Sequence, residues 1–309
     1  MGKKIVVTGG AGFIGSNLVL ELLNQLSEIE VVVIDDFSSG SFKNILNAHC
    51  DIITENLYRF DWSDYFSKKE IEVVFHLASL TDTTILDERR QMQNNVEAFR
   101  SLLRFFSGTS TKIIYASSAA IYGMRSGKNR LQDDPQPANP YGFSKLQMER
   151  LATAYMKENP QTRITGLRYF NVYGPREAHK KSASSMIFQL AKQIKEGKNP
   201  RLFSYGEQKR DFVYVADVVR ATLLTAIKDC PLPLFNVGSG HARSFNDIVH
   251  ILNQTLKTDA KPEYFPCPYS FYQSHTEADL ELTQKHLGYV SKYSLEQGIA
   301  EYFDSGWLL

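Results

Sequence analysis

The sequence predicts an α/β protein built on a doubly wound parallel sheet, with a smaller, mixed lobe in the C-terminal part. Through the first 170 residues, short apolar runs rich in β-formers alternate with longer amphipathic stretches. The runs lack strict polar alternation, which indicates strands buried on both faces by covering helices. A glycine-rich turn joins the first run to the first amphipathic stretch. Together these observations favour the doubly wound class over a sandwich or a helical bundle.

Each element follows from its own pattern. The expected strands are Lys4–Thr8, Val31–Asp35, Glu72–Leu77, Lys112–Ser117 and Arg163–Arg168. The expected helices are Ser16–Gln25, Gln91–Phe106 and Tyr141–Lys157. Beyond Asn171 the pattern loosens, and we expect a helix over Ser182–Glu196 and strands over Arg210–Val219 and Leu234–Val237. The proline-containing tail from Lys257 shows little periodicity and is expected to belong to the smaller lobe.

Composition excludes several classes of function. The chain has 309 residues, with 35 Lys+Arg against 34 Asp+Glu and a formal charge of +1, so neither nucleic acid nor an anionic membrane surface is an expected partner. Cys50, Cys230 and Cys267 are widely spaced, which argues against a disulfide framework or a structural metal site. Without an apolar run of about 18 residues or a signal peptide, a cytoplasmic protein without metal is expected.

The first turn carries a dinucleotide-binding pattern, Thr8-Gly-Gly-Ala-Gly-Phe-Ile-Gly15. Gly9 permits the tight turn, Gly12 lets the backbone approach a pyrophosphate, and Gly15 lets the helix pack on the strand. Asp35, twenty residues after Gly15, ends the second strand, where a carboxylate can bind ribose hydroxyls. The alternative is a plain βα turn, but this combination predicts a Rossmann-like domain. We expect that domain over residues 1–170 with segments returning at about 211–240, and a substrate lobe over about 171–210 and 241–309.

A Tyr-x-x-x-Lys pair can perform acid–base chemistry, because positions i and i+4 share a helix face. The ammonium is expected to lower the pKa of the phenol. Three such pairs occur, Tyr65–Lys69, Tyr141–Lys145 and Tyr205–Lys209. Only the second follows a helix-starting proline and has a serine, Ser118, just past a predicted strand, where ligands bind in such sheets. Ser118, Tyr141 and Lys145 are therefore the predicted proton relay, and the other pairs are expected on the surface.

These motifs resemble the extended short-chain dehydrogenases/reductases, the nucleotide-sugar epimerases and dehydratases. Dehydratases of that branch usually have Thr-Asp-Glu where this chain has Ser-Ser-Ala, so the resemblance favours an epimerase. The stretches Asn171-Val-Tyr-Gly-Pro-Arg-Glu-Ala-His-Lys180, Asn199-Pro-Arg-Leu-Phe203, Lys209-Arg-Asp-Phe-Val-Tyr214 and Tyr272-Gln-Ser-His-Thr-Glu-Ala-Asp279 resemble the ADP-glyceromanno-heptose 6-epimerase family. That family inverts C6 of the heptose in ADP-D-glycero-β-D-manno-heptose by transient oxidation and re-reduction, and supplies the lipopolysaccharide core.

The resemblance also implies site residues. Those that contact the cofactor, besides the glycines and Lys145, are Phe13, Ile14, Asp35, Asp36, Asp61, Leu77, Ala78, Ser79, Asn94 and Val172. Those that contact the nucleotide-sugar substrate are Ser118, Asn171, Ser182, Gln189, Phe203, Ser204, Tyr205, Gly206, Arg210 and Tyr272. Lys180 matches a second acid–base group, needed because the turned carbonyl intermediate no longer presents its oxygen to Tyr141. The resemblance further implies a homo-oligomer.

The sequence leaves alternatives for the form of the cofactor and for the substrate. The resemblance implies NADP, with Lys43 as the candidate for its 2′-phosphate, whereas adjacent carboxylates at Asp35 and Asp36 would repel that phosphate and suit NAD. A UDP-hexose 4-epimerase would share the first half of the sequence but has no need of Lys180. A dinucleotide-sensing regulator without catalysis is the alternative from another class, and the intact Ser118–Tyr141–Lys145 set argues against it.

Overall fold

The structure is a computed structural model that describes residues 3–25, 30–82, 87–267 and 273–308. Its centre is a seven-stranded parallel sheet with the order β11-β7-β5-β4-β1-β2-β3. The strands are β1 (Lys4–Thr8), β2 (Glu30–Ile34), β3 (Asp51–Ile53), β4 (Ile71–His76), β5 (Lys112–Ser118), β7 (Arg163–Tyr169) and β11 (Leu234–Val237). The predicted doubly wound α/β class is confirmed, and the strand order reverses between β1 and β4.

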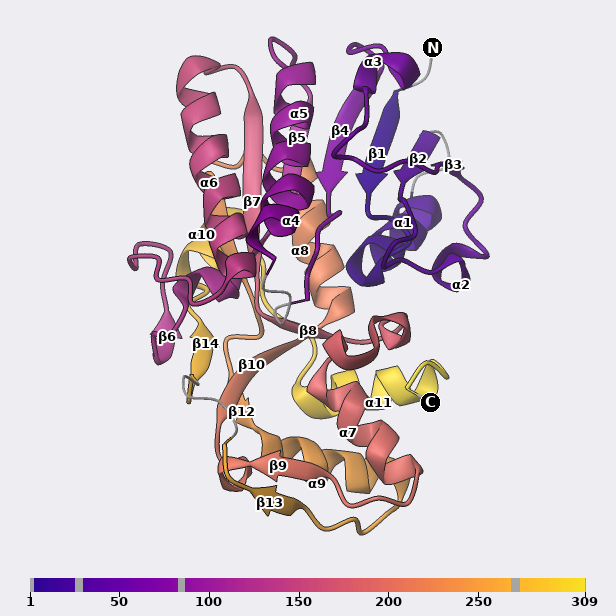
Figure 1. The fold of residues 1–309 in the computed structure, drawn as a ribbon, viewed down its shortest axis with the longest axis vertical. Coiled ribbons are helices and arrows are strands. Elements are labelled where there is room, and N and C mark those ends of the chain that lie inside the picture. The colour runs from indigo at the N-terminus through magenta and orange to yellow at the C-terminus, as the bar shows by residue number, and fades with distance from the viewer. Residues whose placement is uncertain (1–2, 26–29, 83–86, 268–272, 309) are drawn as a thin grey trace.

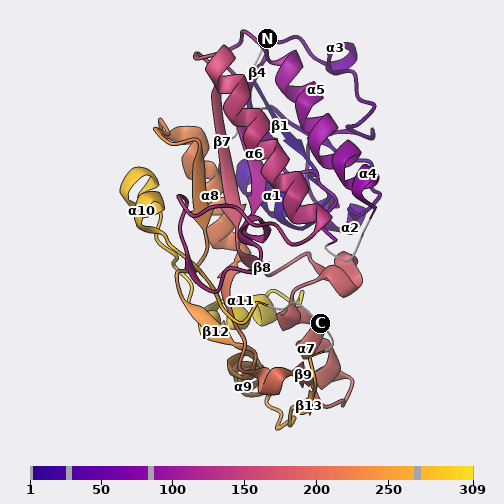
Figure 2. The ribbon, with the colours of Figure 1, turned by 60° about the vertical axis from the view of Figure 1, so that its left-hand side comes forward.

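Helices cover both faces of this sheet (Figures 1 and 2). One face packs on α1 (Phe13–Gln25) and α8 (Val215–Ile227), the other on α5 (Ala98–Phe105) and α6 (Pro140–Glu158). Shorter helices connect the strands: α2 (Phe42–Ile45), α3 (Trp62–Tyr65), α4 (Glu88–Gln91) and the π-helix η1 (Met92–Glu97). Ile5 and Val7 of β1 belong to the first core, and Val6 belongs to the second. The strands are therefore apolar at successive positions because alternate side chains enter two different cores.

A smaller lobe lies below the large sheet in Figure 1. In its three-stranded sheet, β10 (Lys209–Tyr214) lies between β12 (Ala242–Ser244) and β8 (Asn171–Tyr173). Two further pairs are β13 (Glu263–Phe265) with β9 (Arg201–Phe203) and β14 (Thr276–Ala278) with β6 (Gly127–Asn129). Its helices are α7 (Met186–Lys195), α9 (Phe245–Leu256) and α11 (Leu295–Asp304), and α10 (Glu281–Leu287) lies beside β11. Three short 3₁₀ helices complete the described chain: η2 (Ala119–Tyr122), η3 (Ala178–Ala183) and η4 (Ser204–Gly206). β8 and β10 run between the two parts.

One predicted strand is wrong in its second half. The expected strand Arg210–Val219 is β10 as far as Tyr214, and α8 begins at Val215. Residues 212–219 are almost continuously apolar, and such a run does not distinguish a buried strand from a buried helix. The change matters for the site because β10 ends at the boundary between the two parts and carries Arg210 near its start.

Within the described ranges, no helix combines the length and the apolar character needed to span a membrane. In the same ranges, no group of three or more His, Cys, Asp or Glu side chains is arranged to hold a metal ion.

Candidate active site

The glycine loop between β1 and α1 is closely packed. Gly9 has a φ of +71°, and a Cβ there would lie 2.6 Å from the backbone nitrogen of Ala78. A Cβ on Gly15 would lie 2.1 Å from the carbonyl oxygen of Gly9. A larger residue at either position would therefore displace backbone. Gly12 meets only the Gly9 carbonyl oxygen within 4 Å, at 3.1 Å, so the loop remains open toward the space above it.

A cavity of about 820 Å³ lies at the carboxyl ends of β1, β2, β4 and β5. This is the position at which open α/β sheets bind ligands, beside the point where the strand order reverses. Many residues singled out in the sequence line this one cavity: Gly9, Gly12, Phe13, Ile14, Gly15, Asp35, Asp36, Leu77, Ala78, Ser79, Asn94, Ser118, Tyr141, Lys145, Asn171, Val172, Lys180 and Arg210. Residues far apart in the sequence thus meet around one space large enough for a small-molecule ligand.

Carboxylates surround the end of the cavity next to β2. Asp35 is buried, and its oxygens accept hydrogen bonds from the backbone N–H groups of Ala11 and Phe37, each at 2.9 Å. Burial raises the pKa of Asp35, and these hydrogen bonds lower it. Asp36 accepts from Ser38 and from the Asn56 amide, the latter at 2.7 Å. Asp35 therefore fixes the glycine loop as well as lining the cavity.

The predicted relay residues come together from two elements. Ser118 ends β5, and Tyr141 and Lys145 lie on α6, which begins with an Asn139 cap and Pro140 at its first position. Lys145 is 1% exposed, its Nζ donates to the Ala116 carbonyl at 2.8 Å, and it lies 5.8 Å from the centre of the Tyr141 ring. The local sequence fixes this geometry, since proline and an asparagine cap define where the helix starts.

The expectation that Lys145 lowers the pKa of Tyr141 is wrong for this structure. Burial raises the pKa of the Tyr141 phenol, and a hydrogen bond with Ser118 lowers it in part. Burial also lowers the pKa of Lys145 to about 7, so its charge is partly lost at neutral pH. Burial disfavours the charged phenolate and the charged ammonium alike.

A buried ion pair holds the same face of α6 against the sheet. Glu149, four residues after Lys145, accepts two hydrogen bonds from Arg168 of β7, at 2.8 and 2.7 Å. Glu149 also accepts from Ser117 Oγ at 2.6 Å. Because Ser117 precedes Ser118 in β5, this network fixes the register between α6 and the strand that carries Ser118. Such positions are hard to infer from sequence, since Glu149 lies 32 residues from Ser117 and 19 from Arg168.

Lys180 reaches the cavity from η3, in the loop after β8. Its Nζ lies 5.7 Å from the centre of the Phe13 ring, directly at the start of α1. Burial lowers the pKa of Lys180, and the carboxylates of Glu177 and Asp82 raise it. The structure thus brings a desolvated amine and the phenol of Tyr141 to one cavity from two separate elements.

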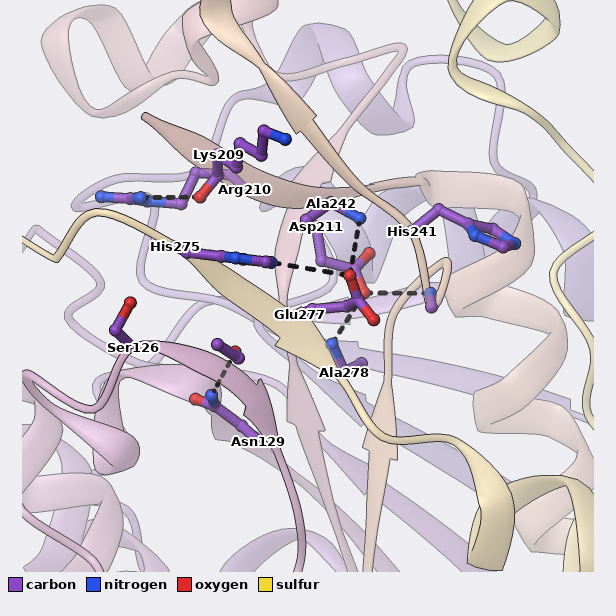
Figure 3. Close-up of polar contacts among 12 residues, drawn as sticks. Ser126, Asn129, Lys209, Arg210, Asp211, His241, Ala242, His275, Glu277 and Ala278 are labelled. Carbon is purple, nitrogen blue, oxygen red and sulfur yellow. Dashed lines mark hydrogen bonds and ion pairs between the residues drawn. The ribbon is translucent and has the colours of Figure 1, made fainter. Parts of the chain in front are cut away.

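Arg210 reaches the cavity from β10, where the neighbouring Asp211 anchors the strand (Figure 3). The Asp211 carboxylate is fully buried and accepts from Ser239 Oγ at 2.6 Å, Gly240 N at 2.9 Å and Ala278 N at 2.9 Å. Burial raises the pKa of Asp211, and these hydrogen bonds lower it. The carboxylate therefore joins β10 to β14 and to the turn after β11, which fixes the strand that presents Arg210.

Several sequence-predicted residues do not line the cavity. Lys43 is exposed on α2, and Asp61 caps α3 by accepting from Ser63. Ser182, Gln189 and Phe203, Ser204, Tyr205 and Gly206 are also outside the lining residues. Tyr205 is 75% exposed, and the residues 204–206 all have positive φ. Tyr272 lies outside the described residues.

Sequence reasoning also missed lining residues. Asp82 and Arg90 line the cavity near Asn94, and His179 lines it beside Lys180. Asp82 and Arg90 lie in no recognisable motif. Asp82 lies shortly after Leu77, in the loop that follows β4. Ligands bind beside the carboxyl ends of strands where the strand order reverses, so the position of this loop could have indicated Asp82.

Comparison with known proteins agrees with this geometry. Residues 5–238 match the model of a family described as the NAD dependent epimerase/dehydratase family. The chain belongs to that family. A relative named ADP-L-glycero-D-manno-heptose-6-epimerase, from Alkalilimnicola ehrlichii, is 36% identical over 97% of this chain and 97% of its own.

Solved structures of epimerases have the same fold as this family member. The Helicobacter pylori ADP-L-glycero-D-manno-heptose-6-epimerase is 37% identical, with a TM-score of 0.89 over 98% of this chain and 96% of its own. The UDP-glucuronic acid 4-epimerase of Bacillus cereus, in complex with UDP-glucuronic acid and NAD, is 30% identical, with a TM-score of 0.85 over 97% and 98%. The fold is thus common to epimerases of different sugars, so residues within the cavity must distinguish the substrates.

Proposed function

We propose that this member of the epimerase/dehydratase family inverts C6 of the heptose in ADP-D-glycero-β-D-manno-heptose, as a step toward the lipopolysaccharide core. The observation that carries the proposal is the placement of Lys180 and Tyr141 around one cavity. The names of the relatives similar over most of the chain support the same activity. We further propose a homo-oligomer.

We infer that the glycine loop binds the pyrophosphate of a dinucleotide. The residues present fit that group, because Gly12 leaves its backbone open and no acidic side chain stands in the first turn of α1. The N–H groups of a first helical turn have no partner within the helix and favour an anion. Residues 1–170 with about 211–240 would bind this group, and about 171–210 with 241–309 the sugar nucleotide.

For the form of the dinucleotide, the local charge favours NAD over the NADP that the resemblance implies. Asp35, Asp36 and Glu55 all line the end of the cavity next to β2, where they would repel a 2′-phosphate. Lys43 is exposed and does not line the cavity, so it does not balance those carboxylates. The Bacillus cereus structure, which contains NAD, supports the same choice.

The chemistry that the dinucleotide supplies when bound is the reversible acceptance of a hydride from the sugar carbon. Tyr141 would hold the proton of the sugar hydroxyl on its phenol oxygen, with Ser118 as the hydrogen-bonding neighbour. Once the resulting ketone has turned, its oxygen would meet Lys180, whose lowered pKa makes proton exchange near neutral pH easier. Arg210 would bind the diphosphate, since its guanidinium fork matches phosphate oxygens.

The experiment is to incubate the protein with ADP-D-glycero-β-D-manno-heptose and NAD or NADP, and to follow the C6 epimer by NMR. UDP-glucose serves as the comparison substrate for the 4-epimerase alternative. Conversion of the heptose alone supports the proposal. Conversion of UDP-glucose alone would support the 4-epimerase, and conversion of neither would leave the non-catalytic regulator.

A further inference from the structure

Asn44 is a buried amide that contacts two separate segments of the cavity wall. It lies on α2 with 4% of its surface exposed. Its Nδ2 donates to the Ala11 carbonyl at 3.0 Å, which belongs to the glycine loop. The same nitrogen lies 3.2 Å from the Arg176 carbonyl oxygen and 3.1 Å from Nδ1 of His179, next to Lys180. One side chain thus joins the glycine loop to the segment that carries Lys180.

That segment is also held together by hydrogen bonds between its own residues. Glu177 has no exposed surface, and its carboxylate accepts from Gly174 N at 3.2 Å and Ser185 Oγ at 2.8 Å. The backbone N–H of Lys180 donates to the Glu177 carbonyl at 3.0 Å. The segment from Gly174 to Ser185 therefore behaves as one unit, and a contact at His179 determines where Lys180 lies.

A second asparagine holds the same segment from α1. Asn17 Nδ2 donates to the Pro175 carbonyl at 3.0 Å, and Asn17 Oδ1 accepts from Arg176 Nη1 at 3.1 Å. Asn17 Nδ2 also donates to the Phe13 carbonyl of its own helix at 2.9 Å, whereas Asn44 contacts both the glycine loop and the imidazole beside Lys180. Asn44 therefore connects the segment that carries Lys180 to the glycine loop.

We propose that Asn44 is a positioning residue for Lys180, setting the amine against the glycine loop through hydrogen bonds to Ala11 and His179. The proposal rests on the proposed function, in which Lys180 is the second acid–base group. An amide suits the position because it donates to carbonyl oxygens and to an unprotonated imidazole nitrogen. Burial lowers the pKa of His179 and so favours the neutral ring, whose Nδ1 accepts from the amide in the tautomer that carries its proton on Nε2.

The test compares Asn44→Leu, which has a similar branched shape but no donors, with Asn44→Ser, which retains one hydroxyl donor. Asn253→Leu is the control. Asn253 is an amide in the smaller lobe, and it donates to the Ala260 carbonyl at 2.9 Å. The first measurement is NMR titration of isotope-labelled lysine amines, with the Lys180 signal assigned by Lys180→Met. It needs no substrate.

In the parent protein the Lys180 amine should titrate below ordinary lysines. In Asn44→Leu its titration should move toward that of an exposed lysine, because the released segment lets water reach the amine. Asn44→Ser should give a smaller shift in the same direction, and Asn253→Leu should give none. An unchanged Lys180 titration in both Asn44 variants would overturn the proposal. If Asn44→Leu does not fold, the Asn44→Ser result decides.

The second measurement follows single turnovers of each C6 epimer by the near-ultraviolet absorbance of the reduced nicotinamide. Misplacing one acid–base group should slow oxidation of only one epimer, by about 10- to 100-fold, and should leave dinucleotide binding unchanged. Equal slowing of both epimers together with weaker dinucleotide binding would show a general structural role and contradict the proposal. If the parent oxidises neither epimer, the proposed function fails, while the lysine titration still decides the position of Lys180.

Discussion

The Nζ of Lys180 lies 5.7 Å from the centre of the Phe13 ring, so an amine carried by the loop after β8 meets the first residue of α1. Phe13 follows the glycine loop directly, and both residues line the cavity that contains Tyr141. The placement brings an amine and a phenol to the site from separate elements. An inversion by oxidation and re-reduction needs such groups, because the sugar oxygen changes its position between the two steps.

Tyr141→Phe should lower turnover by about 10²- to 10⁴-fold, the usual contribution of a general acid–base group. The ring that lines the cavity stays, so dinucleotide binding should remain near the parent value. Tyr65→Phe is the matched control, because Tyr65 also precedes a lysine by four residues but is exposed and outside the cavity. Steady-state kinetics and dinucleotide titration check both variants. Turnover of Tyr141→Phe near the parent rate would remove the phenol from the mechanism.

The parent protein should bind NAD more tightly than NADP, because of the carboxylates next to β2. Asp36→Asn should narrow this difference, since it removes one negative charge and keeps the side-chain shape. Lys43→Ala should change neither affinity, because Lys43 is exposed and outside the cavity. Calorimetric titration with both dinucleotides measures these affinities. A selective loss of NADP binding in Lys43→Ala would instead support the NADP assignment.

Breaking the pair of Glu149 and Arg168 should strongly destabilise the protein. The two residues are 5% and 2% exposed, and removing one partner of such a pair typically costs about 3–5 kcal/mol. Glu149→Gln should therefore lower the free energy of unfolding by a few kcal/mol in urea titrations. Asp229→Asn is the control, because its ion pair with Arg163 is exposed and such pairs contribute only about 0–1 kcal/mol. Similar effects of the two substitutions would contradict the buried role.

His76 should make the fold sensitive to acid. Burial, together with the nearby charge of Lys145, lowers the pKa of His76 to about 3. Between pH 6.5 and about 3 the unfolded chain therefore binds a proton on this ring that the folded protein does not. The free energy of unfolding should fall as the pH is lowered through this range, by up to about 1.4 kcal/mol per pH unit.

Urea unfolding of the parent and His76→Gln at several pH values checks this expectation. The difference in stability between the two proteins should shrink as the pH falls. His250→Gln, at an exposed position, should show no such trend. A difference for His76→Gln that does not change between pH 6.5 and 3 would show that its imidazole charges freely in the folded protein.

Much of the fold could be predicted because local patterns fix it. β1 begins and ends as expected, since an apolar run stops at a glycine turn. The boundary between β10 and α8 was missed because no glycine, proline or cap residue separates Tyr214 from Val215. α11 was missed although Ser294 and Gln297 form a capping box and its apolar positions recur at helical spacing.

The residues of the candidate site also divide into those that local patterns predict and those that they do not. Gly9, Ser118 and Tyr141 belong to short motifs, and the sequence places each at a strand end or helix start. Asn44 belongs to no motif, and its contact with His179 joins positions 135 residues apart. Such a contact exists only after the two parts of the chain have packed, so sequence patterns do not indicate it.

The rate of C6 epimerisation by Lys180→Met tests the two-group account most directly. The account predicts a loss of about 10²- to 10⁴-fold with dinucleotide binding retained, because methionine keeps most of the side-chain length but exchanges no proton. Lys181→Met, at the next residue, should have only a small effect, and His179→Ala, which removes the contact with Asn44, should slow epimerisation less than Lys180→Met does. NMR of the ADP-heptose mixture measures all three rates. Epimerisation by Lys180→Met at nearly the parent rate would contradict the account and leave Tyr141 as the only proton-exchanging group.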